Sequence, residues 1–143
     1  MKKRLMMLVP SLFGLLFAHA ETIDSATAWK MARTFVSQKV EKQPSLRRAL
    51  AMRRDVKPAF IQKSTTTGQP QLYVFNTEEG FVMVSGDTRA KAIAGYSLNG
   101  TWRNDSLPSN LKGWLEGYAR ELEYLAQQPE KSVRNKATTP HCL

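Results

Sequence analysis

The sequence contains only one cysteine, Cys142, and only two histidines, His19 and His141. One cysteine cannot form a disulfide within the chain, so the fold must rest on a hydrophobic core. A zinc site needs three or four protein ligands, which so few cysteines and histidines do not supply. His141 and Cys142 are neighbours, but adjacent side chains of an extended segment point apart, and no third group orients the histidine. No glycine-rich phosphate loop precedes a helix. The composition therefore predicts no catalytic residues, no metal site and no cofactor.

The chain has one long apolar run, and it lies at the N-terminus. Leu5–Phe17 follows the basic residues 2–4 and is followed by Ala18-His19-Ala20. The run is shorter than the roughly 20 residues that span a bilayer, which argues against the alternative of a membrane anchor. A basic start, an apolar centre and small residues at a cleavage site are typical of a secretory signal peptide. We therefore expect residues 1–20 to be removed before Glu21, and the protein to be secreted or periplasmic.

The remaining 123 residues are basic but lack a nucleic-acid motif. Loss of the three basic residues of the signal lowers the net charge from +9 to +6. One dense basic patch stands out, with no aromatic residues between its members: Arg47, Arg48, Arg53 and Arg54. The patch is typical of a solvated face, or of a surface that steers an acidic partner. We expect no nucleic-acid partner, no membrane contact after cleavage, and a monomer in the free state.

Apolar residues at helical spacing predict one helix near each end of the processed chain. The first follows the capping candidates Asp24 and Ser25 and stops before Pro44. The second has Pro108 in its first turn and ends before Pro129. Its apolar face is continuous: Leu111, Trp114, Leu115, Tyr118, Leu122 and Leu125. Gly113 and Gly117 lie off this face, where they are either merely tolerated or allow another surface to approach closely.

The centre of the chain predicts a β-hairpin. Leu72–Phe75 and Phe81–Val84 are apolar throughout, so we expect these strands to be buried on both faces. The five residues Asn76–Gly80 form the predicted loop, with Gly80 at positive φ. Further strands are expected near Phe60–Lys63 and over Ala92–Ser97.

The order of these elements predicts an α+β fold. We expect an antiparallel β-meander of three to five strands, packed with an N-terminal and a C-terminal helix. Asn99-Gly100 predicts another turn, after which Thr101-Trp102 starts a short fourth pairing. The domain is expected to cover residues 21–128, and residues 129–143 to form a flexible tail.

Several segments together resemble a known protein family. The segments are Tyr73–Asn76, Gly80–Asp87, Ile93–Ser97, Gly100–Trp102 and Leu107–Leu115. They resemble the propeptide of streptopain-like cysteine proteases, a module that also occurs as a stand-alone inhibitor of the Spi type. The resemblance implies an α+β domain that covers the active-site cleft of a protease.

The resemblance also implies where the protease is contacted. In the streptopain propeptide, an asparagine just before the last helix points into the specificity pocket, and Asn110 is its counterpart here. The implied inhibitory loop is therefore Leu107, Pro108, Ser109 and Asn110. Other family members block the site with a hairpin, which here is Asn76, Thr77, Glu78, Glu79 and Gly80.

The sequence departs from the zymogen pattern after Pro129, because no protease domain is recognisable there. We therefore interpret the chain as a non-enzymatic, secreted inhibitor that acts in trans on a streptopain-like cysteine protease. The alternatives are a truncated propeptide remnant and a folding assistant without inhibitory activity.

Overall fold

A computed structural model describes residues 22–127 and 141–142 of the chain. The predicted signal peptide and residues 129–140 of the predicted tail lie outside the described residues. The described elements are α1 (Ser25–Lys42), a 3-10 helix (Pro44–Leu46), β1 (Phe60–Lys63), β2 (Pro70–Asn76), β3 (Phe81–Ser85), β4 (Ile93–Ser97), α2 (Ser109–Gln127) and β5 (His141–Cys142). The two α-helices and strands β1 to β4 follow the order expected from the sequence, whereas the 3-10 helix and the strand β5 were not expected.

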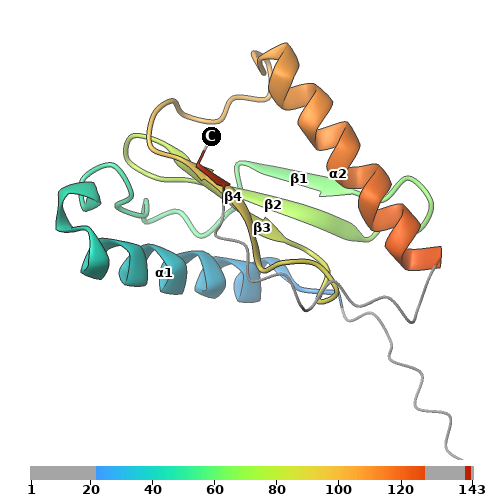
Figure 1. Cartoon of the computed structure of the whole chain (residues 1–143), viewed down its shortest axis with the longest axis horizontal. Coiled ribbons are helices and arrows are strands. Elements are labelled where there is room, and N and C mark those ends of the chain that lie inside the picture. Colours follow the sequence, from blue (N-terminus) through green and yellow to red (C-terminus); the bar gives the residue numbers. More distant parts are fainter. Residues whose placement is uncertain (1–21, 128–140, 143) are drawn as a thin grey trace, which may run out of the picture.

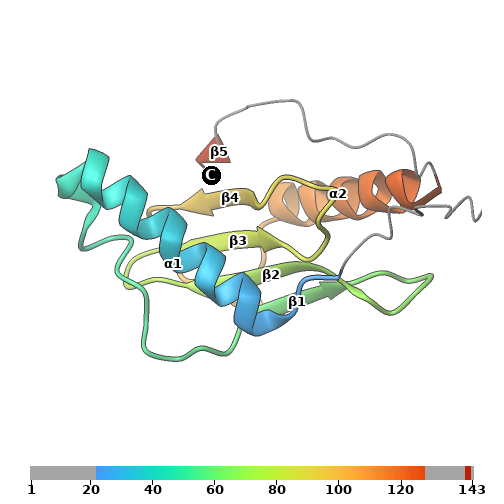
Figure 2. The same cartoon turned by 90° about the horizontal axis from the view of Figure 1, so that it is seen from below.

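The strands form one sheet between the two helices, which confirms the predicted α+β class. Strands β1 to β4 pair antiparallel in chain order, as a meander does. Helix α1 covers one face of this sheet and α2 the other (Figure 1). Within the segment expected to be a tail, β5 adds a short parallel strand beside β4 (Figure 2).

The sheet divides the hydrophobic core into two layers. Because successive side chains of a strand point to opposite faces, Tyr73 and Phe75 pack toward α1 while Leu72 and Val74 pack toward α2. Strand β3 divides in the same way. All five residues of β3 and the inner five of β2 are buried. The prediction of a central hairpin that is buried on both faces is therefore confirmed.

Helix α1 begins where the sequence predicts. The carboxylate of Asp24 accepts a hydrogen bond from the backbone N–H of Thr27 at 2.7 Å and so caps the helix. This backbone hydrogen bond lowers the pKa of Asp24 below its ordinary value. The residues that α1 buries against the sheet lie four positions apart: Ala28, Ala32 and Val36.

Gly80 has a different role from the one predicted. Only Gly68 and Gly100 have positive φ among the described glycines, so the prediction of positive φ at Gly80 is wrong. Instead, a Cβ atom at Gly80 would lie 1.9 Å from the backbone oxygen of Ser97. Glycine is required because the β4 backbone passes so close. The turn predicted at Asn99-Gly100 is confirmed, with a φ of 83° at Gly100.

The predicted pairing at Thr101-Trp102 is also wrong, because these residues form no strand. The backbone of Trp102 is instead hydrogen-bonded by the side-chain amide of Asn76. Its Oδ1 accepts a hydrogen bond from the backbone N–H of Trp102 at 2.8 Å, and its Nδ2 donates to the carbonyl of Trp102 at 3.3 Å. One side chain thus satisfies both backbone groups of Trp102, as a neighbouring strand would.

Helix α2 differs from its prediction at Pro108, and the structure bears on the two alternatives left open for its glycines. It begins at Ser109, so Pro108 precedes the first turn, and the Pro108 carbonyl accepts hydrogen bonds from Leu111 and Lys112. No described atom outside the local helix backbone lies within 4 Å of a Cβ built at Gly113 or Gly117. The described part of the chain therefore makes no close approach at either glycine.

Candidate functional site

The predicted inhibitory loop lies at the N-terminal end of α2. Leu107 is half-buried and packs on the core layer beneath α2, which anchors the loop. Pro108, Ser109 and Asn110 are exposed. An anchored base with exposed residues at its tip suits a segment that contacts another protein, because little chain entropy is lost on docking.

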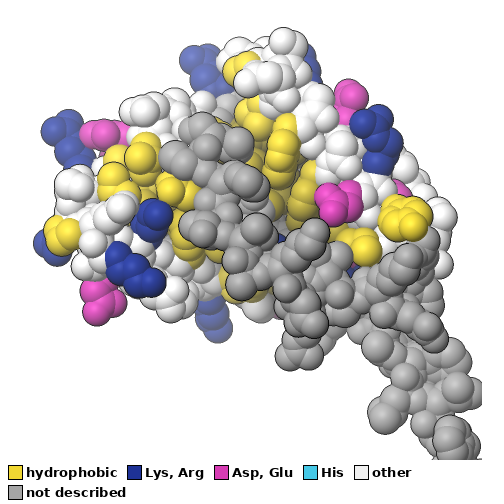
Figure 3. All heavy atoms as spheres, viewed as in Figure 1, with side chains coloured by type: hydrophobic (Ala, Val, Ile, Leu, Met, Phe, Trp, Pro, Cys, Tyr) yellow, Lys and Arg dark blue, Asp and Glu magenta, His cyan; other side chains and the backbone are white. Residues whose placement is uncertain are grey.

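An apolar groove lies beside this loop. It has a volume of about 470 Å³. Its apolar walls come from the sheet, the loop and α2: Phe81, Trp102, Leu107, Leu111 and Trp114. Polar residues at its edge include Thr101, Ser106 and Asn110. Figure 3 shows hydrophobic side chains exposed along the seam between α2 and the sheet.

Aromatic contacts hold the floor of the groove in place. The ring of Trp102 stacks on Phe60 with centroids 5.3 Å apart and meets Phe81 edge-on at 5.2 Å. The indole N–H of Trp102 donates to the side chain of Asn104 at 3.0 Å. Trp102 is only 4% exposed, so the groove is a preformed feature of the fold.

The alternative contact hairpin is fastened to the segment that follows α1. The Thr77 hydroxyl donates to the carbonyl of Ala49 at 2.7 Å and accepts from the N–H of Gly80 at 3.0 Å. The backbone N–H groups of Glu78 and Glu79 also donate to carbonyls of this segment. Thr77 and Gly80 are consequently buried, while the side chains of Glu78 and Glu79 are exposed. An exposed ion pair joins Glu79 to Arg48 at 2.8 Å.

The structure brings both candidate contact segments to the same end of the molecule. Asn76, at the start of the hairpin, binds the backbone of Trp102 in the groove floor. Arg53 donates from Nε to the carbonyl of Thr77 at 2.9 Å and from Nη2 to the hydroxyl of Thr101 at 3.3 Å. The hairpin tip, the groove and the N-terminus of α2 therefore form one continuous surface, which we call the loop end.

Sequence reasoning did not assign Arg53 or Trp102 to this surface. The sequence places Arg53 in a basic patch, and it places Trp102 in a short strand and in one of the segments that resemble the propeptide family. Neither residue has a local pattern that indicates its long-range partner, since Arg53 lies 48 residues from Thr101.

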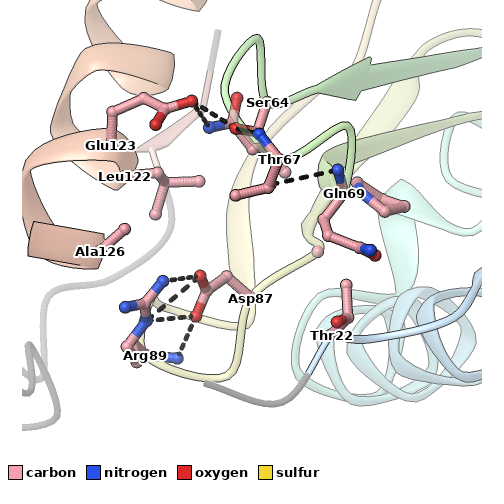
Figure 4. Close-up of a pocket in the computed structure, with 12 residues that line it drawn as sticks. Thr22, Ser64, Thr67, Gln69, Asp87, Arg89, Leu122, Glu123 and Ala126 are labelled. Atoms are coloured by element: carbon pink, nitrogen blue, oxygen red, sulfur yellow. Dashed lines mark hydrogen bonds and ion pairs between the residues drawn. The ribbon is translucent and has the colours of Figure 1, made fainter. Parts of the chain in front are cut away.

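A polar pocket of about 300 Å³ lies at the opposite end of α2 (Figure 4). There Asp87 and Arg89 form a close ion pair, with Nη2 and Oδ2 2.6 Å apart, and their side chains are 16% and 20% exposed. Arg89 also donates to the carbonyl of Leu125 in α2 at 3.3 Å. Glu123 accepts hydrogen bonds from Ser64 at 2.5 Å and from Gln71 at 3.3 Å. These contacts fasten the C-terminal half of α2 to the sheet.

Two carboxylates of this pocket have lowered pKa values. Partial burial alone would raise the pKa of Asp87, but the hydrogen bonds and charge of Arg89 outweigh it and hold the pKa below the ordinary value. The hydrogen bond from Ser64 is the main reason that the pKa of Glu123 is also lowered. Both groups are therefore stabilised in their charged form.

Acid is expected to weaken the attachment of α2. A carboxylate with a lowered pKa stabilises the fold above its unfolded pKa, and this contribution is lost as the pH falls through the folded pKa. We expect the thermal unfolding midpoint to be steady between about pH 7 and 5 and to fall below about pH 4. Circular dichroism melts across this range measure it.

Two Asp to Asn variants test this prediction, one at the partly buried ion pair and one at an exposed control position. Asp87→Asn should lower stability near neutral pH and flatten the acid limb of the curve. Asp105→Asn should change little, because Asp105 is 72% exposed and its pair with Arg103 is 3.6 Å long. Equal effects of the two variants would contradict the role given to Asp87.

The described residues contain no metal-binding cluster and no helix suited to span a membrane, and they include one tyrosine with a raised pKa. No group of three or more His, Cys, Asp or Glu residues within 22–127 and 141–142 is placed to hold a metal ion. In the same residues, neither helix is both long and apolar enough to cross a membrane. Burial raises the pKa of the Tyr118 hydroxyl to about 12, which keeps this group protonated at neutral pH.

Comparison with known proteins identifies the class to which this fold and surface belong. The family model described as Spi protease inhibitor matches residues 20–122. The chain therefore belongs to the Spi protease inhibitor family, which confirms the resemblance seen in the sequence.

One curated relative is a protease. Over 105 residues the chain is 31% identical to the thiol protease/hemagglutinin PrtT of Porphyromonas gingivalis. The match covers 72% of this chain but only 11% of the relative, so the chain spans about a tenth of that protein's length. No solved structure gives a significant match.

Proposed function

We propose that this protein inhibits a streptopain-like thiol protease in trans, by laying its loop end over the active-site cleft. The family describes protease inhibitors, and the similar protein PrtT is named as a thiol protease. The observation that supports the loop end as the contact surface is that the inhibitory loop, the groove and the hairpin lie next to one another on it. The exposed residues Pro108 to Asn110 lie beside a preformed apolar groove, and Asn76 at the start of the hairpin is hydrogen-bonded to Trp102 in the floor of that groove.

Asn110 is the residue we propose to enter the specificity pocket of the protease. It is exposed in the first turn of α2, and its neighbour Leu107 anchors the preceding chain in the core. The side chain is thus presented on a rigid base, as a residue that fills a pocket must be. The net positive charge would also speed the encounter with an acidic protease surface.

Substitution of Asn110 is expected to weaken inhibition. The purified chain is mixed with a streptopain-like thiol protease whose own propeptide has been removed, and the inhibition constant is measured with a peptide substrate. Asn110→Ala and the bulky Asn110→Trp should each raise the constant about tenfold or more, as losses at the centre of an interface do.

The matched control is Glu116→Ala, an exposed position of α2 about 9 Å along the helix axis from Asn110. It should inhibit like the unchanged protein. If the unchanged protein inhibits but neither Asn110 variant alters the constant, Asn110 is not the inserted residue. Failure of the unchanged protein to inhibit at micromolar concentration would refute inhibition in trans.

A role as a propeptide is the second candidate, favoured because the similarity to PrtT covers only a small part of a protein named as a protease. In that case the domain would keep a protease latent or assist its folding. Adding the chain to an unfolded protease domain should then raise the yield of refolded enzyme. An inhibitor without this role leaves that yield unchanged, and a truncated remnant shows neither effect.

Secretion is part of the proposal. Residues 1–20 have the sequence of a signal peptide, so the inhibitor would meet its protease in the periplasm or outside the cell. Mass spectrometry of the protein exported from its host tests this, and the expected N-terminus is Glu21.

A further inference from the structure

We propose that the groove beside the inhibitory loop is a docking pocket for an apolar side chain of the partner protease. An acidic residue of the protease, next to that side chain, would lie against the positive edge of the groove. This inference rests on the proposed function, because the occupant comes from the same protease that meets Asn110. It adds a second point of recognition, separate from the residue that enters the active site.

The walls of the groove are formed by residues of the hydrophobic core layer beneath α2, which the described residues leave partly uncovered. Phe81 and Trp102 belong to the buried layer beneath α2, while Leu111 and Trp114 pack on that layer and remain partly exposed. The layer is therefore open toward the loop end. The groove has a volume of about 470 Å³, which is in the range of pockets that bind ligands and is enough for a large side chain.

The groove does not have to rearrange before it binds. Trp102 is held by two ring contacts, by its indole hydrogen bond and by both hydrogen bonds of Asn76. Apolar surface that is already fixed gains most of its burial energy on binding, because few side chains lose freedom. A single inserted apolar side chain would act as the anchor of such an interface.

The charges around the groove indicate the chemistry of the occupant's neighbour. Arg103 lines the groove and is 68% exposed. Arg53 reaches the edge of the groove through Thr101, and exposed Lys112 follows Leu111 on α2. The carboxylate of Asp105 pairs with Arg103, so the remaining positive charge beside the groove comes from Arg53 and Lys112. The edge of the groove is therefore positive, and it is complementary to an acidic residue.

Continuity with the inhibitory loop identifies the partner. Leu107, Pro108 and Asn110 form one wall of the groove, so any protein seated on Asn110 also covers the groove. A second copy of this chain fits less well, because both copies would bring the same positive edge.

The groove is tested by filling it. Ser106 is exposed, lines the groove and precedes the inhibitory loop without being part of it. Ser106→Trp should raise the inhibition constant for the thiol protease about tenfold or more, because the new ring occupies the pocket. The matched control, Ser37→Trp, makes the same change on the exposed side of α1 and should leave the constant unchanged.

A charge variant tests the acidic neighbour. Arg103→Glu should weaken inhibition several-fold, and this loss should shrink as salt is added. Arg33→Glu makes the same change at an exposed position of α1 and should have a smaller effect. Thermal melts of all four variants confirm that each is folded, and Asn99→Trp replaces Ser106→Trp if that variant does not fold, since Asn99 also lines the groove.

The outcomes separate this inference from the proposed function. If the unchanged protein inhibits and the groove variants inhibit equally well, the docking pocket is wrong and the proposed function stands. If the unchanged protein does not inhibit the protease, both are wrong. If sedimentation of the free chain shows a dimer that Ser106→Trp dissociates, the groove binds a second copy and the inference is overturned.

Discussion

Replacing Gly80 with alanine is expected to destabilise the protein by about 3 kcal/mol, the upper range for forcing an extra methyl group into a packed interior. The added Cβ would lie 1.9 Å from the backbone oxygen of Ser97, a distance at which the backbone itself must move. Because Gly80 is buried and directly precedes β3, this movement would separate β3 from β4. Chemical denaturation followed by circular dichroism measures the free energy of unfolding.

The same substitution has the opposite expected effect in α2. Gly113→Ala should stabilise the protein by about 1 kcal/mol, because alanine is the better helix former and no described atom outside the local helix backbone crowds its Cβ. Comparing the two variants shows whether the loss of stability at Gly80 comes from the nearby Ser97 backbone or from replacing any glycine with alanine. If Gly80→Ala did not lower the free energy of unfolding, the claim that the β4 backbone lies too close to Gly80 for a side chain would be contradicted.

Asn76→Ala is expected to have the second largest effect. It removes both hydrogen bonds to the backbone of Trp102, and it leaves the N–H and carbonyl of a 4% exposed residue without these partners. Loss of such bonds costs about 2 kcal/mol in stability. Because Trp102 forms the groove floor and the following chain leads to Leu107, we also expect weaker inhibition.

The control for Asn76 is Gln38→Ala. Gln38 is an exposed amide residue on α1, and it does not line the groove, so its side chain should contribute little to stability or inhibition. Inhibition constants and unfolding free energies of both variants give the comparison. An Asn76→Ala protein that matches Gln38→Ala in both measurements would contradict the proposed link between hairpin and groove.

Much of the fold could be predicted from local patterns. The cap at Asp24, the apolar face of α2 and the two-sided burial of Leu72–Phe75 follow from side-chain spacing alone. Each of these features depends on residues within one or two turns of helix or one strand. Local propensity and periodicity therefore determine them.

The errors concern residues whose partners are distant in the chain. Gly80 was expected to have positive φ because glycine at a hairpin often does, whereas its real neighbour is Ser97. Thr101-Trp102 was expected to pair as a strand, but the partner is a side chain 26 positions away. No local pattern distinguishes these cases, because the alternative geometries have the same sequence signature.

The sequence by itself determined that this is an α+β domain with a central hairpin, without evident catalytic residues, and that it resembles protease propeptides and Spi-type inhibitors. It left two contact segments open, the loop at Leu107–Asn110 and the hairpin at Asn76–Gly80. Only the tertiary structure decided that they share one end of the molecule, through the bonds of Asn76 and Arg53. The physical reason is that element type depends on neighbours in sequence, whereas a binding surface depends on contacts between segments that only the packed sheet brings together.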